Sequence, residues 1–317
     1  MNLMNTNLAS SITKAASKQT YYTIRFLVDR ERVDDAYRAY AYFRWVDDVL
    51  DAELGSGPAI KYGEPSERMM FLERQKPLLE SCYRGEPPLD VNIQEKMLVE
   101  LVQHDQEKNS GLQSYLRNMM LVMDFDVRRR GRVISQSELN EYTRWLAIAV
   151  TDNLQYFVGH GDYAPSDETR YQAVSAAHII HMLRDTYDDL KAGYLNIPLE
   201  TLDANSIRPE DVTSEAYQSW VKGRVQLAHD YFEAGKIYFN RIQNLRHRLA
   251  GIAYISRFEW VMGKIEEESY SLRSHYNERK SIRTGVRMIW LTLSSLVKMS
   301  RSGALPQPVV ARPLGKS

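Results

Sequence analysis

The chain has 317 residues, of which 44% are hydrophobic, and its 41 basic residues balance its 41 acidic ones. That length can bury a large core, in one big domain or in two smaller ones. The zero net charge excludes a global field for nucleic acid, so a charged partner must be recognised by a local cluster. The single cysteine, Cys82, excludes an internal disulfide, and we expect a cytoplasmic protein.

Hydrophobic residues recur with the helical period along nearly the whole chain, and the alternating pattern of strands is missing. We therefore expect an all-α protein. The first 28 residues contain no acid and are rich in Ser, Thr and Asn. We interpret them as a frayed N-terminus that leads into a helix, in preference to an organellar presequence. The expected helices span about residues 31–54, 66–84, 92–125, 136–160, 167–193, 214–245, 247–275 and 278–299.

Segments rich in Gly, Pro, Asn and Asp separate several of these helices. They lie at residues 55–66, 84–90, 160–168 and 196–211. None is long or biased enough to be a domain linker, and no repeat of fixed period is visible. We therefore predict a single all-α domain over residues 1–299, followed by a flexible basic tail over residues 300–317.

Two predicted helices carry acids on an otherwise apolar background. In the first (AYFRWVDDVLDAE, 41–53), Asp47 and Asp51 are four residues apart and share one face, with Asp48 beside them and Arg44 and Tyr40 extending the stripe. The second, at residues 178–198, repeats this arrangement. Its members are His178, His181, Arg184, Asp185, Asp188 and Asp189.

Carboxylates on one helix face repel each other unless a cation neutralises them, and oxygen ligands suit a hard divalent ion such as Mg²⁺. Because Mg²⁺ often completes its shell with phosphate oxygens, we expect a diphosphate to be held between the two acidic helices. Arg44 and Arg184 would bind the remaining phosphate charge. The expected metal ligands are Asp47, Asp48, Asp51, Asp185, Asp188 and Asp189.

The same residues fit alternative structures to different degrees. A single D-D-x-x-D run is commonly a solvated helix face with ion-pair partners four residues away. A di-iron carboxylate bundle would need Glu-x-x-His pairs, which the chain lacks. No cysteine or third histidine lies at helical spacing from His178 and His181 to complete a zinc site, so we expect the two histidines in the core or lining a pocket.

These motifs resemble the signatures of the squalene/phytoene synthases, the head-to-head prenyl synthases. Residues 37–51 are similar to the family's first aspartate-rich signature and 183–198 to its second, and the resemblance spans roughly residues 17–290. The matching residues are Tyr40, Arg44, Asp47, Asp51, Arg184, Asp185, Asp189, Gly193 and Pro198. Between them, Asp126 and Tyr142 match an acid and a tyrosine of the family. In the N-terminal phosphate-binding stretch, the corresponding candidates are Lys18, Thr20 and Tyr21.

The resemblance implies an isoprenoid synthase helical bundle around a deep central cavity. Family members bind two allylic prenyl diphosphates, ionise one with Mg²⁺ and couple the cation to the other, which gives a cyclopropylcarbinyl diphosphate. Some then rearrange it to squalene with NADPH, others to dehydrosqualene or phytoene without it. The chain has no glycine-rich dinucleotide fingerprint, so the use of NADPH is not indicated but stays open. A C15 or C20 prenyl diphosphate is the expected substrate.

The chain departs from the family pattern around the expected cavity. His178 and His181 replace a glutamine and an asparagine, and Ile148 and Thr151 stand where the family has glycines that allow close approach. After the second signature, Tyr194 and Asn196 replace the usual arginine and tyrosine. We expect these changes to spare ionisation and to affect the site of the second substrate.

Three functional hypotheses follow. The first is head-to-head condensation in a reshaped cavity. In the second, bulk at Ile148 and Thr151 closes one chain site, and a single prenyl diphosphate is cyclised or transferred to a non-prenyl acceptor, with His178 or His181 as base. The third is a non-catalytic scaffold, which the intact acidic stripes and arginines disfavour.

The C-terminal region combines basic and apolar residues. From residue 279 to residue 317 there are eight basic residues and no acid. The last expected helix is therefore a candidate for peripheral contact with an anionic membrane, and a helix packed on the core with a solvated basic end explains the same pattern. Its longest apolar run, at residues 288–299, is too short for the roughly 20 apolar residues of a spanning helix.

Overall fold

The computed structural model describes residues 2–51 and 65–276, and all regular elements within these ranges are helical. This confirms the all-α prediction. The α-helices are α1 (Asn2–Ala16), α2 (Lys18–Leu27), α3 (Val33–Asp51), α4 (Pro65–Tyr83), α5 (Ile93–His104), α6 (Gly111–Arg129), α7 (Gln136–Phe157), α8 (Gln172–Ala192), α9 (Leu199–Asn205), α10 (Glu215–Arg241) and α11 (Leu245–Glu267). The short 3₁₀ helices are η1 (Arg30–Arg32) and η2 (Glu168–Tyr171).

The prediction of one helix over residues 92–125 was wrong. Helix α5 ends at His104 and α6 begins at Gly111. Between them Asn109 adopts the left-handed conformation with φ 54°, and the Ser110 side chain accepts a hydrogen bond from the Gln113 amide. A local side-chain cap thus competes with helix continuation, as Ser and Asn often do.

Two further boundaries differ from the sequence prediction. Helix α9 lies inside the expected 196–211 loop, and α11 ends at Glu267, well before residue 275. Ser269 and Tyr270 both have positive φ, 53° and 66°, which ends α11. The expected helix at residues 278–299 and the tail at 300–317 lie outside the described residues, so the domain boundary stays a prediction.

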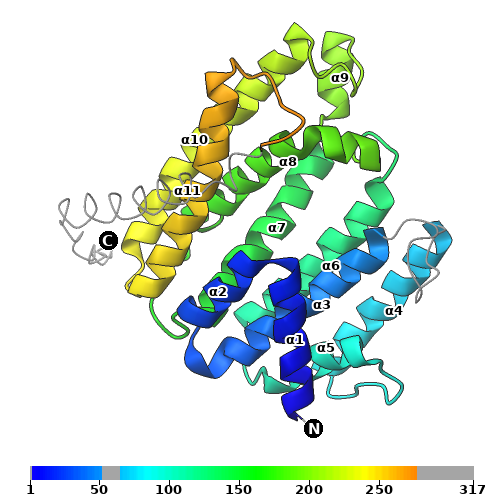
Figure 1. The fold of residues 1–317 in the computed structure, drawn as a ribbon, viewed down its shortest axis with the longest axis vertical. Coiled ribbons are helices and arrows are strands. Elements are labelled where there is room, and N and C mark those ends of the chain that lie inside the picture. Colours follow the sequence, from blue (N-terminus) through cyan, green and yellow to red (C-terminus); the bar gives the residue numbers. More distant parts are fainter. Residues whose placement is uncertain (1, 52–64, 277–317) are drawn as a thin grey trace, which may run out of the picture.

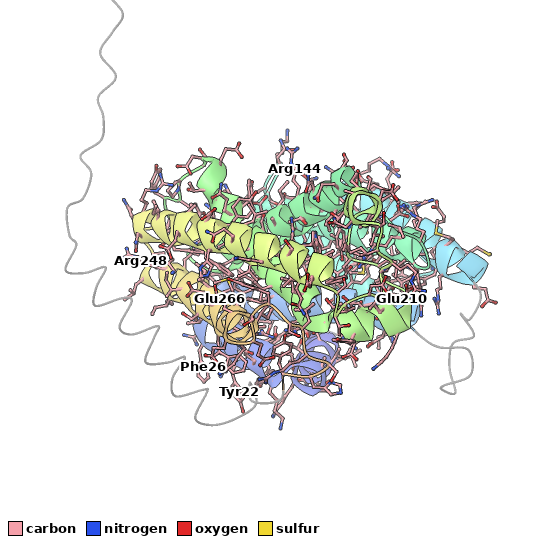
Figure 2. The ribbon with its side chains drawn as sticks, turned by 90° about the horizontal axis from the view of Figure 1, so that it is seen from above. Tyr22, Phe26, Arg144, Glu210, Arg248 and Glu266 are labelled. Carbon is pink, nitrogen blue, oxygen red and sulfur yellow. The ribbon has the colours of Figure 1, made fainter. Side chains whose placement is uncertain are left out.

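The N-terminal segment differs from the expected frayed end that leads into one helix, because it forms two helices, α1 and α2. Ser17 separates α1 from α2 and caps α2 by accepting from the Thr20 amide. Helix α1 packs along α3. Tyr22 and Phe26 of α2 are exposed on the side of the molecule opposite Arg144 of α7 (Figure 2).

The helices share two hydrophobic clusters that meet at α7. The first cluster is built mainly from α3 to α7, and the second from α8, α10 and α11. Leu154 of α7 packs against both. Helix α8 lies between α7 on one side and α10 and α11 on the other (Figure 1). Among the described helices, none is long and apolar enough to span a membrane.

Helices α8 and α10 approach each other closely in the second cluster. A Cβ added at Gly235 would lie 2.6 Å from Ala173 Cβ and 2.9 Å from Ala173 Cα. Backbone cannot yield as a flexible side chain does, so we predict that Gly235→Ala destabilises the protein by about 1–3 kcal/mol. Thermal unfolding should show a lower Tm.

A matched control for this variant lies on the same helix. A Cβ added at Gly223 would meet nothing within 4 Å. Gly223→Ala should therefore stabilise α10 by up to about 1 kcal/mol, because alanine loses less backbone entropy on folding than glycine. Equal Tm values for the two variants would contradict the close contact.

Candidate active site

Helix α3 is fixed by its apolar face and presents its acids on the other. Val46, Val49 and Leu50 are at most 5% exposed in the first cluster. Asp47 and Asp51 share the opposite face, and the Asp47 side chain is 41% exposed. Arg44, one turn earlier, pairs with Asp47 at 3.3 Å and also with Asp48.

Helix α8 repeats this arrangement with a different pairing. Arg184 Nε donates to Asp185 Oδ1 at 2.6 Å, and His181 Nε2 lies 2.9 Å from Asp185 Oδ2. The expected phosphate-binding arginines, Arg44 and Arg184, are therefore each paired with acids of their own helix. A bound phosphate would have to exchange with these carboxylates.

A buried arginine on α6 connects α8 with the loop after it. Arg129 is 6% exposed, and its Nε donates to Asp126 Oδ1 at 2.7 Å. Its Nη1 donates to Asn196 Oδ1 at 2.8 Å, and Asn196 Nδ2 donates to Asp189 Oδ2 at 2.6 Å. Tyr142 donates from α7 to Asp126 Oδ2 at 3.0 Å. One guanidinium thus ties Asp189 to the ends of α6 and α7.

The same network reaches the acids of α3. The Arg129 guanidinium lies 4.7 Å from the centre of the Tyr194 ring, a cation–π distance. Tyr194 Oη donates a long hydrogen bond, 3.5 Å, to Asp51 Oδ1. The acidic segments of α3 and α8 therefore converge on one set of residues, which we name the Arg129 network: Asp126, Arg129, Tyr142, Tyr194 and Asn196.

The pKa values show that part of the negative charge in this region is uncompensated. Burial, with repulsion from Asp51, raises the pKa of Asp47 to about 6 despite Arg44. Burial, with repulsion from Asp185, raises the pKa of Asp189 to about 6 despite the Asn196 hydrogen bond. Asp185 behaves differently: burial alone would raise its pKa, but hydrogen bonds from Arg184 and then His181 lower it below the usual value.

The carboxylate oxygens suit a hard cation, but the described residues alone do not form a complete site for one. No group of three or more His, Cys, Asp or Glu side chains within the described ranges is arranged to hold a metal ion. Mg²⁺ is commonly bound through one or two carboxylates together with substrate phosphates, so this arrangement fits that mode. Asp47, Asp51 and Asp189 are the acids best placed to supply the carboxylates. Asp48 and Asp188 are exposed and pair with Arg44 and Lys191.

His178 is buried and uncharged. It is 5% exposed, and burial, aided by the charges of His181, Arg129 and Arg224, lowers its pKa to about 3. Thr143 Oγ1 donates to the Leu139 carbonyl at 2.8 Å, and His178 Nδ1 lies 3.0 Å from Thr143 Oγ1. With the single hydroxyl proton directed at Leu139, His178 Nδ1 is the donor to Thr143 Oγ1. Nε2 then carries a lone pair, as a base would.

The other predicted site residues are less closely connected to the acids. Thr20 donates to Ser17, and Tyr21 stacks on Tyr37 at 5.3 Å, whereas Lys18 is exposed. Among the contacts of the described residues, none joins these three to the aspartates. Tyr40 is half-buried against the first cluster and lies near Arg44. Despite burial, the pKa of Arg44 is raised mainly by its hydrogen bond to Asp48, and Tyr40 adds to this shift.

The two positions that replace family glycines differ from each other. Thr151 is 2% exposed, and within the described part of the chain its hydroxyl has no hydrogen-bond partner. Ile148 is half-buried and is not among the residues packed on either hydrophobic cluster. A pocket-lining role for both, and the deep central cavity itself, stay predictions.

Comparison with known proteins identifies the family. The squalene/phytoene synthase model matches residues 13–285. This chain belongs to the squalene/phytoene synthase family. It is accordingly an enzyme of the prenyltransferase type in isoprenoid biosynthesis. Among curated protein sequences, none matches this member of the family significantly.

Solved structures show the same isoprenoid synthase fold. The squalene synthase HpnC from Alicyclobacillus acidocaldarius aligns with a TM-score of 0.65 and 16% identity over 85% of this chain and 95% of that chain. A dehydrosqualene synthase in complex with ligand aligns with a TM-score of 0.70 and 15% identity over 94% of this chain and 98% of that chain. At these identities the alignments speak for the fold alone.

Sequence reasoning missed the central residue of the site. Arg129 lies inside the Arg-rich stretch that follows Asp126, but nothing singled it out from Arg128 or Arg130. The available signal was its spacing of three residues from Asp126, which puts the two on one helix face. Tyr194 and Asn196 were noted only as departures from the family pattern, whereas both belong to the Arg129 network.

The raised pKa of Asp47 has a consequence for the metal-free protein. A carboxyl whose pKa is higher in the folded protein than in the unfolded chain stabilises the folded state at low pH. This stabilisation is lost as the pH rises through about 6. In EDTA at pH 7.5, Asp47→Asn should therefore raise the Tm. The rise should be only about 1–3 °C, because solvent screens the half-exposed charge. Below about pH 3 the difference should vanish, since the carboxyl is then neutral in both states.

The control is Glu141→Gln, which removes an exposed charge from α7 and should leave the Tm unchanged. A lower Tm than wild type for Asp47→Asn at pH 7.5 would contradict this prediction. It would show that the neighbours of Asp47 stabilise its ionised form.

Proposed function

We propose that this enzyme ionises an allylic prenyl diphosphate with Mg²⁺ and condenses it head-to-head with a second prenyl diphosphate. The observation that carries the proposal is the convergence of two acidic helices on the Arg129 network, which contacts Asp51 of α3 through Tyr194 and Asp189 of α8 through Asn196. Membership of the squalene/phytoene synthase family supports the reaction class. A C15 or C20 chain is the proposed substrate, and the use of NADPH is left open.

The residues would divide the work between binding and orientation. When bound, Mg²⁺ would stabilise the charge that develops on the departing diphosphate. Asp47, Asp51 and Asp189 would hold the cation, and the Arg129 network fixes the spacing between their helices. Arg44 and Arg184 would leave their carboxylates and take phosphate oxygens. Ionisation breaks the carbon–oxygen bond, and its electron pair leaves with the diphosphate. A double bond of the second chain then supplies the pair for the new carbon–carbon bond, and the carbocation that this leaves on the second chain loses a proton to the released diphosphate.

Product analysis tests this proposal directly. C10, C15 and C20 diphosphates, each with and without NADPH, should give a product with two prenyl chains, detected by mass spectrometry. Asp47→Asn and Asp185→Asn should each reduce magnesium-dependent release of diphosphate at least about 100-fold, because each removes charge from one of the two acidic helices. Glu141→Gln is the matched control and should keep wild-type turnover. If both aspartate variants retain that turnover, the mechanism is wrong.

A second candidate function has its own observation. His178 is a neutral, buried imidazole whose Nδ1 proton is committed to Thr143, so Nε2 is free to accept a proton. An enzyme that ionises one prenyl diphosphate and then cyclises it, or transfers it to a non-prenyl acceptor, would need such a base. A product with a single prenyl chain in the same mass spectra would favour this candidate.

The proposed base can be tested through the ratio of product to released diphosphate. His178→Phe should lower that ratio 10-fold or more while diphosphate release continues, because proton removal follows ionisation. In the wild-type enzyme the ratio should stay constant between pH 5.5 and 8, since the pKa of His178 is lowered to about 3. Thr143→Val, which removes the acceptor of the Nδ1 proton, should give an intermediate ratio. An unchanged ratio in His178→Phe would exclude the base.

A further inference from the structure

Helix α2 packs one face on the core and turns an aromatic face to solvent. Ile24 is 7% exposed and Val28, the residue that ends the helix, is 8% exposed, and both belong to the first cluster. Tyr22 and Phe26 are four residues apart on the other face, with exposed fractions of 51% and 70%. Their rings stack with centres 6.1 Å apart (Figure 2). Single exposed apolar side chains are ordinary on protein surfaces, whereas these two rings form one shared apolar surface.

Basic side chains flank this aromatic pair. Lys18 precedes Tyr22 by four residues and Arg25 follows it by three, so the helical period places both beside Tyr22. Both are exposed, and within the described part of the chain neither forms an ion pair with an acid. We name Lys18, Tyr22, Arg25 and Phe26 the outer face of α2.

The chain around this face is also poor in negative charge. Residues 1–28 contain three basic residues and no acid. The next acid along the chain, Asp29, is buried and paired with Arg246. Glu31 follows it and stands beside Arg30 in sequence. The segment that forms α1 and α2 therefore has a net positive charge that no acid of its own balances.

This charge decides between the possible partners of the outer face. A second copy of the chain, packed symmetrically on it, would bring like charges close together. The C-terminal region has the same sign of charge, with eight basic residues and no acid from residue 279 to residue 317. An anionic lipid surface fits both features of the face. Basic side chains are attracted to it, and aromatic rings are favoured at the boundary between head groups and acyl chains.

We propose that α2 docks the enzyme on an anionic membrane surface, with Tyr22 and Phe26 at the level of the head groups and Lys18 and Arg25 against lipid phosphates. This assigns membrane contact to the N-terminal part of the chain, whereas the sequence pattern pointed to the C-terminal part. The docking does not depend on the proposed reaction. If that reaction holds, its prenyl product is an apolar molecule, and docking brings its release close to an apolar phase.

Cosedimentation of the full chain with lipid vesicles tests the docking. Wild-type protein should bind vesicles of phosphatidylcholine and phosphatidylglycerol more tightly than vesicles of phosphatidylcholine alone, and added salt should weaken this binding because it screens the charges. Phe26→Ser should lower the partition coefficient on the mixed vesicles about tenfold, since it removes one inserted ring. Arg25→Gln should lower it about fivefold, the contribution of one basic residue near an anionic surface.

Two matched controls lie on other helices. Met70 of α4 is 71% exposed, so Met70→Ser removes an apolar side chain as exposed as Phe26. Arg144→Gln removes an exposed arginine on the side of the molecule opposite Tyr22 and Phe26 (Figure 2). Both should bind the mixed vesicles as wild type does. All four variants should keep the wild-type Tm, because substitutions of exposed side chains change stability little, so weaker binding cannot be ascribed to unfolding.

Three outcomes would overturn the proposal. Wild-type protein that fails to bind the mixed vesicles would exclude the docking. If either Phe26→Ser or Arg25→Gln binds them as tightly as wild type, the outer face of α2 does not make the contact. Light scattering without lipid tests the remaining partner, since a wild-type dimer that Phe26→Ser converts to a monomer would assign the face to a second copy of the chain.

Discussion

The site depends on one buried guanidinium whose hydrogen bonds are made from several directions. A charge at 6% exposure is stable only where its donors are satisfied, and Asp126 and Asn196 accept from Arg129 at opposite ends of its fork. The rings of Tyr142 and Tyr194 lie 4.9 Å and 4.7 Å from it. Displacing any of these groups would expose an unpaired charge to an apolar interior, so their relative positions are strongly constrained.

Around this fixed point the protein holds unsatisfied charges of both signs. The carboxyls of Asp47 and Asp189 have raised pKa values because burial and neighbouring acids disfavour their ionised forms. The guanidiniums of Arg224 and Arg257 have lowered pKa values because burial disfavours theirs.

The sequence allowed the helical class and the acidic pairs to be predicted because both follow from local spacing. Asp47 and Asp51, or Asp185 and Asp189, share a face wherever the helix lies. The partners of Arg129 could not be read in this way, since Asn196 comes from a loop 67 residues away in sequence. Its selection from three consecutive arginines depends on which one α6 turns inward, and that is decided by packing.

The errors in the helix boundaries have a common physical origin. Between α5 and α6, Asn109 and Ser110 offer the backbone alternative hydrogen bonds, which the hydrophobic period does not register. At the end of α11, three consecutive glutamates, 266 to 268, lie at the unfavourable end of the helix dipole. Both signals are present in the sequence, but they are weaker than the apolar periodicity that favoured longer helices.

Two glycines join the loop after α6 to the loop after α8 through the main chain. Gly131 and Gly193 both have positive φ, 77° and 85°, and the Gly131 amide donates to the Gly193 carbonyl at 2.7 Å. The loop that follows Arg129 and the loop that carries Tyr194 and Asn196 are therefore joined through main-chain atoms. The register of the two loops is thus set by a bond that does not depend on the side chains that either loop carries.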